Sequence, residues 1–169
     1  RSFIALEEKR PLPPNAQEQD KRIAPEVLRF FDVRYVIVHP PYAGTDLEEY
    51  AKTVLTMERI YDQGGIRAYR VTLPPPAATV TVSLAGDLGR LYRGEGWSEP
   101  EGSYRWAQRQ EARLFLPLQA GQAYGLTLRA LSPGPGQKVT LRLNGQAVGT
   151  VAMAEGWQEL TFGLPAEQH

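Results

Sequence analysis

Short segments in which apolar and polar residues alternate dominate the second half of the chain. In residues 78–85, Val80, Val82 and Leu84 share one parity, and threonines and a serine hold the other. Four further segments repeat this alternation (residues 111–118, 123–131, 137–145 and 157–164). Asn144 and Gly145 stand between two such runs, which is a strong signal for a two-residue hairpin turn. Several short strands with no helix among them predict a β-sandwich, jelly-roll-like domain.

The first 71 residues have a mixed pattern that predicts a small α/β lobe. Residues 1–15 are broken by prolines after a short apolar start, so we expect an edge strand followed by irregular chain. Residues 24–33 suit a short helix that begins near Pro25. The almost continuous apolar run 33–38 predicts a strand covered on both faces.

The clearest helix signal lies between residues 44 and 57. Thr45 and Glu48 have the spacing of a capping box, in which each side chain satisfies a free backbone N–H group. An apolar stripe follows at helical spacing (Leu47, Tyr50, Ala51, Val54 and Leu55). Residues 57–71 then predict a β-hairpin that turns at Gly64 and Gly65.

Three consecutive prolines separate the two halves of the sequence. Such a run favours stiff, extended chain, so residues 72–78 are interpreted as a hinge. The predicted organisation is therefore an α/β lobe over residues 1–71, the hinge at 72–78 and the sandwich over residues 79–169. The fold class is mainly β with a small α/β lobe.

The charge balance and the absence of cysteine exclude several functions. The 169 residues carry 19 basic and 19 acidic side chains, so no basic excess favours nucleic acid as a partner. Without cysteine there are no disulfides, no thiol catalysis and no cysteine-bound metal. No apolar run approaches the roughly 18 residues that a membrane span requires. The chain begins at Arg1 rather than Met, so we interpret it as a fragment or processed product.

Two parts of the sequence together resemble a known group of proteins. Residues 28–41 ("LRFFDVRYVIVHPP"), the capped helix, the hairpin "MERIYDQGGIRAYRV" and the Pro-rich hinge are similar to a soluble segment of polytopic bacterial membrane proteins. These proteins are glycosyltransferase-like and use lipid-phosphate-linked sugars. Residues 94–118 and 139–165 resemble the jelly-roll domain that is often appended to them. The resemblance covers most of the chain, but it consists of strand and turn patterns rather than catalytic motifs.

The resemblance implies an accessory role. In that family the transferase chemistry belongs to the membrane-embedded part, so this chain is expected to be non-catalytic, extracytoplasmic and anchored through its parent protein. Its expected partners are the parent membrane domain and a glycan or lipid-linked sugar. The alternative is a free-standing carbohydrate-binding or protein-interaction module. The sequence does not indicate an oligomeric state.

Motifs for catalysis and metal binding are missing from the sequence. The only histidines are His39 and His169, and neither belongs to a zinc or nucleophile motif. We interpret His39 as a structural residue. We expect no cofactor, with a structural calcium ion on Asp87 or a glutamate of the second domain as an alternative. Glycoside hydrolysis by paired glutamates near residue 100 is the least favoured function.

The segment from Gly94 to Leu118 holds the best candidates for ligand binding. Sugar rings stack on aromatic side chains while carboxylates and arginines bind their hydroxyl groups. The predicted glycan site consists of five residues in this segment: Trp97, Glu99, Glu101, Tyr104 and Arg105. The two other tryptophans, Trp106 and Trp157, are predicted to face the core, because each enters a regular strand.

Overall fold

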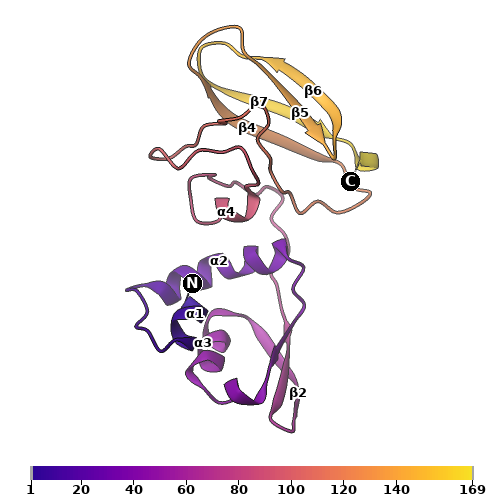
Figure 1. Ribbon diagram of the computed structural model, residues 1–169. Helices are drawn as coiled ribbons and strands as arrows, with labels where there is room; N and C mark the ends of the chain where they lie inside the picture. Colours follow the sequence, from indigo (N-terminus) through magenta and orange to yellow (C-terminus); the bar gives the residue numbers. More distant parts are fainter. Residues whose placement is uncertain (1, 169) are drawn as a thin grey trace. The chain divides into compact units, whose positions relative to one another are not determined.

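The computed structural model describes residues 2–168, which form two compact units (Figure 1). The first extends to Pro117 and the second begins at Leu118. The fold is mainly β, with seven strands in antiparallel sheets and a few helices among the described residues. The proline run 72–78 lies inside the first unit. Arg1 and His169 are outside the described residues.

The first unit begins with helices where the sequence had indicated a strand. Residues 2–7 form α1 (Ser2–Glu7), so the expected edge strand in residues 1–15 was wrong. The rings of Phe3 and Tyr50 meet edge to face with their centroids 5.6 Å apart. An early helix that docks through an aromatic contact satisfies its own backbone groups, and it needs no strand partner.

The next helix, α2 (Ala16–Phe30), starts well before the predicted position and contains Pro25 in its interior. The added N-terminal part consists of good helix formers such as alanine, glutamine and glutamate. These residues continue the helix through Pro25, although a proline in a helix interior usually costs about 3 kcal/mol. Pro25 therefore does not mark the helix start that the sequence suggested.

A three-stranded antiparallel sheet forms the other half of this α/β region. The strands are β1 (Tyr35–Val38), β2 (Met57–Gln63) and β3 (Ile66–Val71), in the order β1-β3-β2. The predicted hairpin is confirmed: β2 and β3 pair across Gly64 and Gly65, whose φ angles of 59° and 77° suit a turn that glycine adopts without strain.

The helix α3 (Asp46–Val54) confirms the strongest helix prediction. Tyr50, Ala51 and Val54 from its apolar stripe are buried. A short 3₁₀ helix, η1 (Pro40–Tyr42), connects β1 to α3. Strand β1, however, is not covered on both faces, because Tyr35 and Ile37 are 55% and 59% exposed.

Two segments of the first unit that were predicted as strands are not regular strands. Residues 78–85 pair with no other segment in the described part of the chain, and Val80 is half exposed. Residues 111–118 contain a single isolated bridge from Leu114. A segment with alternating side chains forms a regular strand only when the edge of another strand is available to pair with it. These two segments have no such edge along their length.

A one-turn helix, α4 (Gly89–Tyr92), anchors the segment after the prolines to α2. Tyr92 is buried, its ring packs edge-on against Phe30, and its hydroxyl donates to Glu26 Oε1 at 2.6 Å. Burial, reinforced by the neighbouring Glu26 carboxylate, raises the pKa of Tyr92. This contact ties residues 89–92 to the first unit.

The second unit consists of two antiparallel strand pairs. The strands β4 (Tyr124–Ser132) and β7 (Gly156–Leu164) form one pair, and β5 (Lys138–Leu143) and β6 (Gln146–Ala152) form the other. The predicted Asn144–Gly145 turn is confirmed, with φ angles of 49° and 86°. A 3₁₀ turn, η2 (Ala166–Gln168), follows β7.

Both strand pairs contribute side chains to one core. Met153, Leu160 and Phe162 are buried at its centre, and partly buried apolar residues surround them (Leu128, Ala130, Val139, Leu141 and Val151). A Cβ atom built on Gly149 would lie 3.4 Å from Phe162 Cδ1, so β6 runs close to β7. Among residues 2–168, no helix combines the length and apolarity that crossing a membrane requires.

Candidate functional site

The predicted glycan-binding residues all lie on one irregular hairpin of the first unit. We call residues 93–114 the rim hairpin. Its two arms exchange backbone hydrogen bonds, from Gly94 N–H to Arg113 O at 2.9 Å and from Arg113 N–H to Glu95 O at 2.8 Å. Closer to the tip, Ser98 N–H donates to Trp106 O at 2.9 Å. Because several backbone bonds hold the arms, the tip is positioned before any ligand arrives.

The tip of the rim hairpin brings two aromatic rings and a carboxylate together. A tight turn joins Glu101 to Tyr104, and the backbones of these two residues pair in an isolated bridge. The rings of Tyr104 and Trp106 meet edge to face with their centroids 5.4 Å apart. The indole N–H of Trp106 donates to Glu101 Oε2 at 3.0 Å. The cluster therefore combines an aromatic surface with a fixed hydrogen-bond acceptor.

Trp106 is half-buried and hydrogen-bonded within this cluster, so it is not the core residue that the sequence predicted. The prediction used strand alternation, which assumes a regular two-faced sheet. The backbones of the two arms pair through isolated bridges and not through a continuous ladder, so the parity rule does not extend along them.

The other predicted residues occupy different positions on the hairpin. Glu99 projects into solvent with 98% of its side chain exposed. Trp97 is half-buried, and its indole N–H donates to Arg113 O at 2.8 Å, which fixes the ring against the opposite arm. The structure therefore groups Glu101 and Tyr104 with Trp106, while Trp97 and Glu99 lie elsewhere along the same arm.

Arg105 points inward rather than toward the solvent. Its side chain is only 7% exposed. The guanidinium donates to Leu84 O at 3.0 Å and to Ser98 O, and it lies 3.9 Å from the Glu99 carboxylate. These bonds to backbone carbonyls fasten the hairpin to the preceding segment. Arg105 therefore holds the hairpin backbone in place and does not face the solvent.

A second arginine beneath the hairpin adds to the positive charge there. Arg93 Nε donates to Gly89 O at 3.2 Å. Burial, together with the neighbouring cations Arg105 and Arg90, lowers the pKa of Arg93. The base of the hairpin is thus cationic, and its tip carries the carboxylates Glu99 and Glu101.

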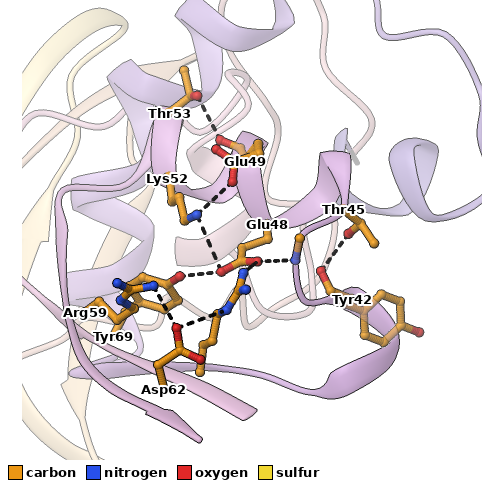
Figure 2. A network of polar contacts seen from close by, with 11 residues as sticks. Tyr42, Thr45, Glu48, Glu49, Lys52, Thr53, Arg59, Asp62 and Tyr69 are labelled. Atoms are coloured by element: carbon orange, nitrogen blue, oxygen red, sulfur yellow. Dashed lines mark hydrogen bonds and ion pairs between the residues drawn. The ribbon is translucent and has the colours of Figure 1, made fainter. Parts of the chain in front are cut away.

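A buried polar network forms between α3 and the sheet (Figure 2). The carboxylate of Glu48 is fully buried, and it accepts hydrogen bonds from the Gly44 N–H at 2.5 Å, from Arg67 Nη1 at 2.5 Å and from the Tyr69 hydroxyl. Lys52 Nζ lies 3.6 Å away. Figure 2 shows Tyr69 and Lys52 pointing toward the Glu48 carboxylate. Asp62 Oδ2 lies 3.5 Å from Arg67 Nε.

The predicted capping box at Thr45 and Glu48 was wrong in detail. The Thr45 side chain does not cap the helix; its hydroxyl donates to Tyr42 O at 2.7 Å. Glu48 binds the N–H of Gly44 instead of that of Thr45, and it turns inward to Arg67 and Tyr69. The spacing from Thr45 singled out Glu48, but it did not identify the hydrogen-bond partners of Glu48 on β3.

The environment of Glu48 favours its charged form. Burial alone raises the pKa of this carboxyl group, but the hydrogen bonds from Gly44, Tyr69 and Arg67 and the positive charge of Lys52 outweigh burial and lower the pKa to about 2. Burial and the same carboxylate raise the pKa of Tyr69. A carboxylate with this low pKa and these partners stabilises the fold and is a poor general acid.

A surface pocket of about 550 Å³ lies between α2, the end of α3 and the proline run. Lys21, Leu28, Met57 and Pro74 are among its lining residues, together with Lys52. Glu49 Oε1 lies 2.7 Å from Lys52 Nζ, so this ammonium group already has an anionic partner. None of the five predicted glycan-binding residues lines this pocket, and the rim hairpin remains the better-defined polar and aromatic cluster.

Trp157 of the second unit is not a core residue, contrary to the prediction. It is 48% exposed, and the Arg129 guanidinium carbon lies 5.0 Å from the centre of its ring. Strand β7 buries Leu160 and Phe162, so the parity of Trp157 places it on the outer face. Sequence reasoning missed this exposed tryptophan, although its odd spacing from Leu160 was a visible signal.

The candidate metal and acid–base residues do not gather into a site. His39 and Asp87 are both exposed, and His39 O accepts the backbone bonds that close η1. Within residues 2–168 there is no group of three or more acidic or histidine side chains arranged to hold a metal ion.

Comparison with known proteins adds no relative: no family model, no curated protein and no solved structure matches this chain.

Proposed function

We propose that this chain is a non-catalytic, extracytoplasmic accessory domain of a glycosyltransferase-like membrane protein, and that the rim hairpin contacts a glycan. The observation that carries the binding role is the cluster of Tyr104, Trp106 and Glu101. It offers an aromatic surface for the C–H face of a sugar and a carboxylate for its hydroxyl groups. The accessory role rests on the sequence resemblance.

The stiffness of the rim hairpin supports binding at its tip. Ser98 is buried, its hydroxyl donates to Glu99 O at 2.6 Å, and it accepts the Trp106 N–H at 2.9 Å. Arg105 binds the carbonyls of Leu84 and Ser98. A ligand that meets a prearranged tip loses less binding energy to the ordering of loops and side chains.

The buried carboxylate favours a binding role over a catalytic one. The pKa of Glu48 is strongly lowered, and its carboxylate oxygens already accept hydrogen bonds from Gly44, Arg67 and Tyr69. The tip carboxylates Glu99 and Glu101 are exposed, whereas the general acid of a glycosidase is held in an apolar, water-poor pocket. We therefore assign the acidic residues to ligand contact and to folding.

We further propose that the second unit is part of a jelly-roll-like sandwich. Its two strand pairs share one core around Leu160 and Phe162. Each pair has only two strands, and isolated two-stranded sheets are marginally stable. Shared packing between the pairs supplies the apolar burial that neither pair has alone.

A glycan array tests the binding role. The chain is applied to oligosaccharides of hexoses, N-acetylhexosamines and deoxyhexoses, alongside its Trp106→Ala and Glu101→Gln variants. We expect selective binding that falls at least tenfold in both variants, with Trp157→Ala as the matched control that keeps it. A folded protein with no signal across the array would contradict glycan contact.

Two further measurements test the other parts of this proposal. Turnover of activated glycosides that disappears in Glu99→Gln or Glu101→Gln would overturn the non-catalytic assignment. The gene region that encodes the chain separates the accessory role from a free-standing module. Several encoded membrane spans upstream favour the accessory role, and a signal peptide directly before this chain favours the free-standing module.

A further inference from the structure

The three-stranded sheet of the first unit has one face that no described segment covers with apolar packing. Side chains alternate along each strand, and Tyr69, Arg67 and Val38 lie on the side of Glu48 and α3. The opposite parity forms what we call the open face (Tyr35, Ile37, Glu58, Tyr61, Gln63, Ile66, Ala68 and Arg70). The pairing register places these residues on adjacent strands.

The open face is unusually apolar for a surface in water. Tyr35 and Ile37 are more than half exposed, Tyr61 is 46% exposed and Ile66 is 37% exposed. Single exposed apolar residues are common, but several adjacent ones on one face of a sheet indicate an interaction surface. An interaction surface on this face also explains why β1 is almost continuously apolar, the pattern that predicted burial on both faces.

We propose that the open face binds the open face of a second copy of this chain, forming a symmetric dimer. Its charges are the first reason. Glu58 and Arg70 are direct cross-strand neighbours in the register of β2 and β3, and each is exposed. One acidic and one basic side chain at the same level make this face complementary to itself, as a two-fold interface requires.

The sizes of the side chains give the second reason. Tyr61 pairs with Ala68 in the same register, so a large and a small side chain stand next to each other. A two-fold axis parallel to the strands, between β2 and β3, places Tyr61 opposite Ala68 of the second copy. The same axis places Glu58 opposite Arg70. Facing sheets pack about 10 Å apart, which side chains of these sizes fill.

The dimer is expected to be weak. Three strands at a spacing of about 4.8 Å make a face roughly 14 Å wide. Strands of about six residues are roughly 20 Å long, so the face covers roughly 300 Å². This area is well below the roughly 800 Å² that each partner contributes to a standard stable interface. We therefore expect association at high micromolar concentration and a monomer at low micromolar concentration.

Charge reversal gives the decisive experiment. We expect Glu58→Arg and Arg70→Glu each to remain monomeric in analytical ultracentrifugation up to about 1 mM, at least tenfold weaker in self-association than the unchanged chain. An equimolar mixture of the two variants restores both ion pairs, so it should dimerise. The double variant Glu58→Arg/Arg70→Glu should also dimerise. Circular dichroism of each variant confirms that it is folded.

Controls separate this proposal from other occupants of the open face. Glu18→Arg on α2, where the side chain is 77% exposed, changes the charge equally and should leave dimerisation intact. Tyr61→Lys should prevent it. A chain that stays monomeric at 1 mM would overturn the proposal, and so would single variants that dimerise like the unchanged chain. A monomer that binds anionic lipid vesicles through Ile37 and Tyr61 would assign the face to a membrane instead.

Discussion

The hydroxyl of Tyr69 on β3 donates a hydrogen bond to the buried carboxylate of Glu48 on α3. Arg67, two residues earlier on the same strand, binds the other oxygen of that carboxylate at 2.5 Å. One glutamate thus connects the helix to the central strand of the sheet. The sequence separation of 21 residues between Glu48 and Tyr69 makes it a tertiary contact that fixes how α3 lies on the sheet.

Replacing this carboxylate should destabilise the first unit strongly. Glu48→Gln keeps the size of the side chain but leaves Arg67 and Tyr69 without a charged acceptor in a buried position, a change that costs roughly 3 kcal/mol. Urea unfolding at pH 7 measures the effect. The neighbouring Glu49→Gln is the matched control, since Glu49 is 64% exposed, and its effect should stay within about 0.5 kcal/mol. Equal effects of the two substitutions would contradict the assigned role of Glu48.

The stability of the first unit should fall in acid because of Glu48. Its pKa is lowered from 4.5 to about 2 in the folded chain, so the unfolded chain binds the proton more readily. The contribution is fully present above pH 4.5 and is lost as the pH falls toward 2, which amounts to roughly 3 kcal/mol. Unfolding curves between pH 6 and 2 measure it. Glu48→Gln should show a shallower decline, and an identical decline would sink this explanation.

The arms of the rim hairpin approach too closely at Gly96 for any other residue. Its φ angle is +92°, and a Cβ atom there would lie 2.2 Å from Glu111 O and 2.8 Å from Ala112 Cα. Gly96→Ala should therefore separate the arms, destabilise the unit by about 2 kcal/mol or more and change the near-ultraviolet circular dichroism of Trp97.

Gly102 provides the control for this steric effect. Its φ angle is +64°, but no atom lies within 4 Å of a Cβ built there. Gly102→Ala should cost only the conformational strain of about 1 kcal/mol. Comparable losses for the two glycines would mean that the close approach at Gly96 is not important.

Strand β7 carries one exposed and one buried aromatic residue, and the two should respond differently to truncation. Trp157→Ala removes a ring that packs with Arg129 at the surface, so we expect a loss of about 1 kcal/mol. Phe162→Ala opens a cavity in the core of the second unit and should cost about 3–5 kcal/mol. Thermal unfolding followed by circular dichroism compares them. A larger loss for Trp157→Ala would restore the predicted core position.

Local signals in the sequence predicted the elements that depend on local chemistry. The two-residue turn between β5 and β6 requires positive φ angles, which Asn144 and Gly145 adopt at low cost. Gly64 and Gly65 do the same between β2 and β3. The apolar stripe of α3 also follows from spacing alone, because the helix repeat places Tyr50, Ala51 and Val54 on one face.

The failures concern features that depend on distant partners. Residues 78–85 alternate as a strand does, but no edge pairs with them among the described residues. Glu48 has capping spacing, yet its conformation is decided by Arg67 and Tyr69 on another element. The same limit applies to the rim hairpin, whose polar and aromatic residues are visible in the sequence. The sequence did not indicate that Trp106 would join the cluster and that Arg105 would turn inward.

The indole N–H signals of the three tryptophans offer the most direct test of the proposed glycan contact. They are recorded by two-dimensional NMR of the ¹⁵N-labelled chain and assigned with Trp→Phe variants. Oligosaccharides from the same three sugar classes are then titrated in. We predict a saturable shift of the Trp106 signal, whose N–H faces Glu101, while the Trp157 signal stays in place. Signals that remain unmoved by every sugar, or a shift confined to Trp157, would contradict the assignment of the rim hairpin as the glycan-contacting site.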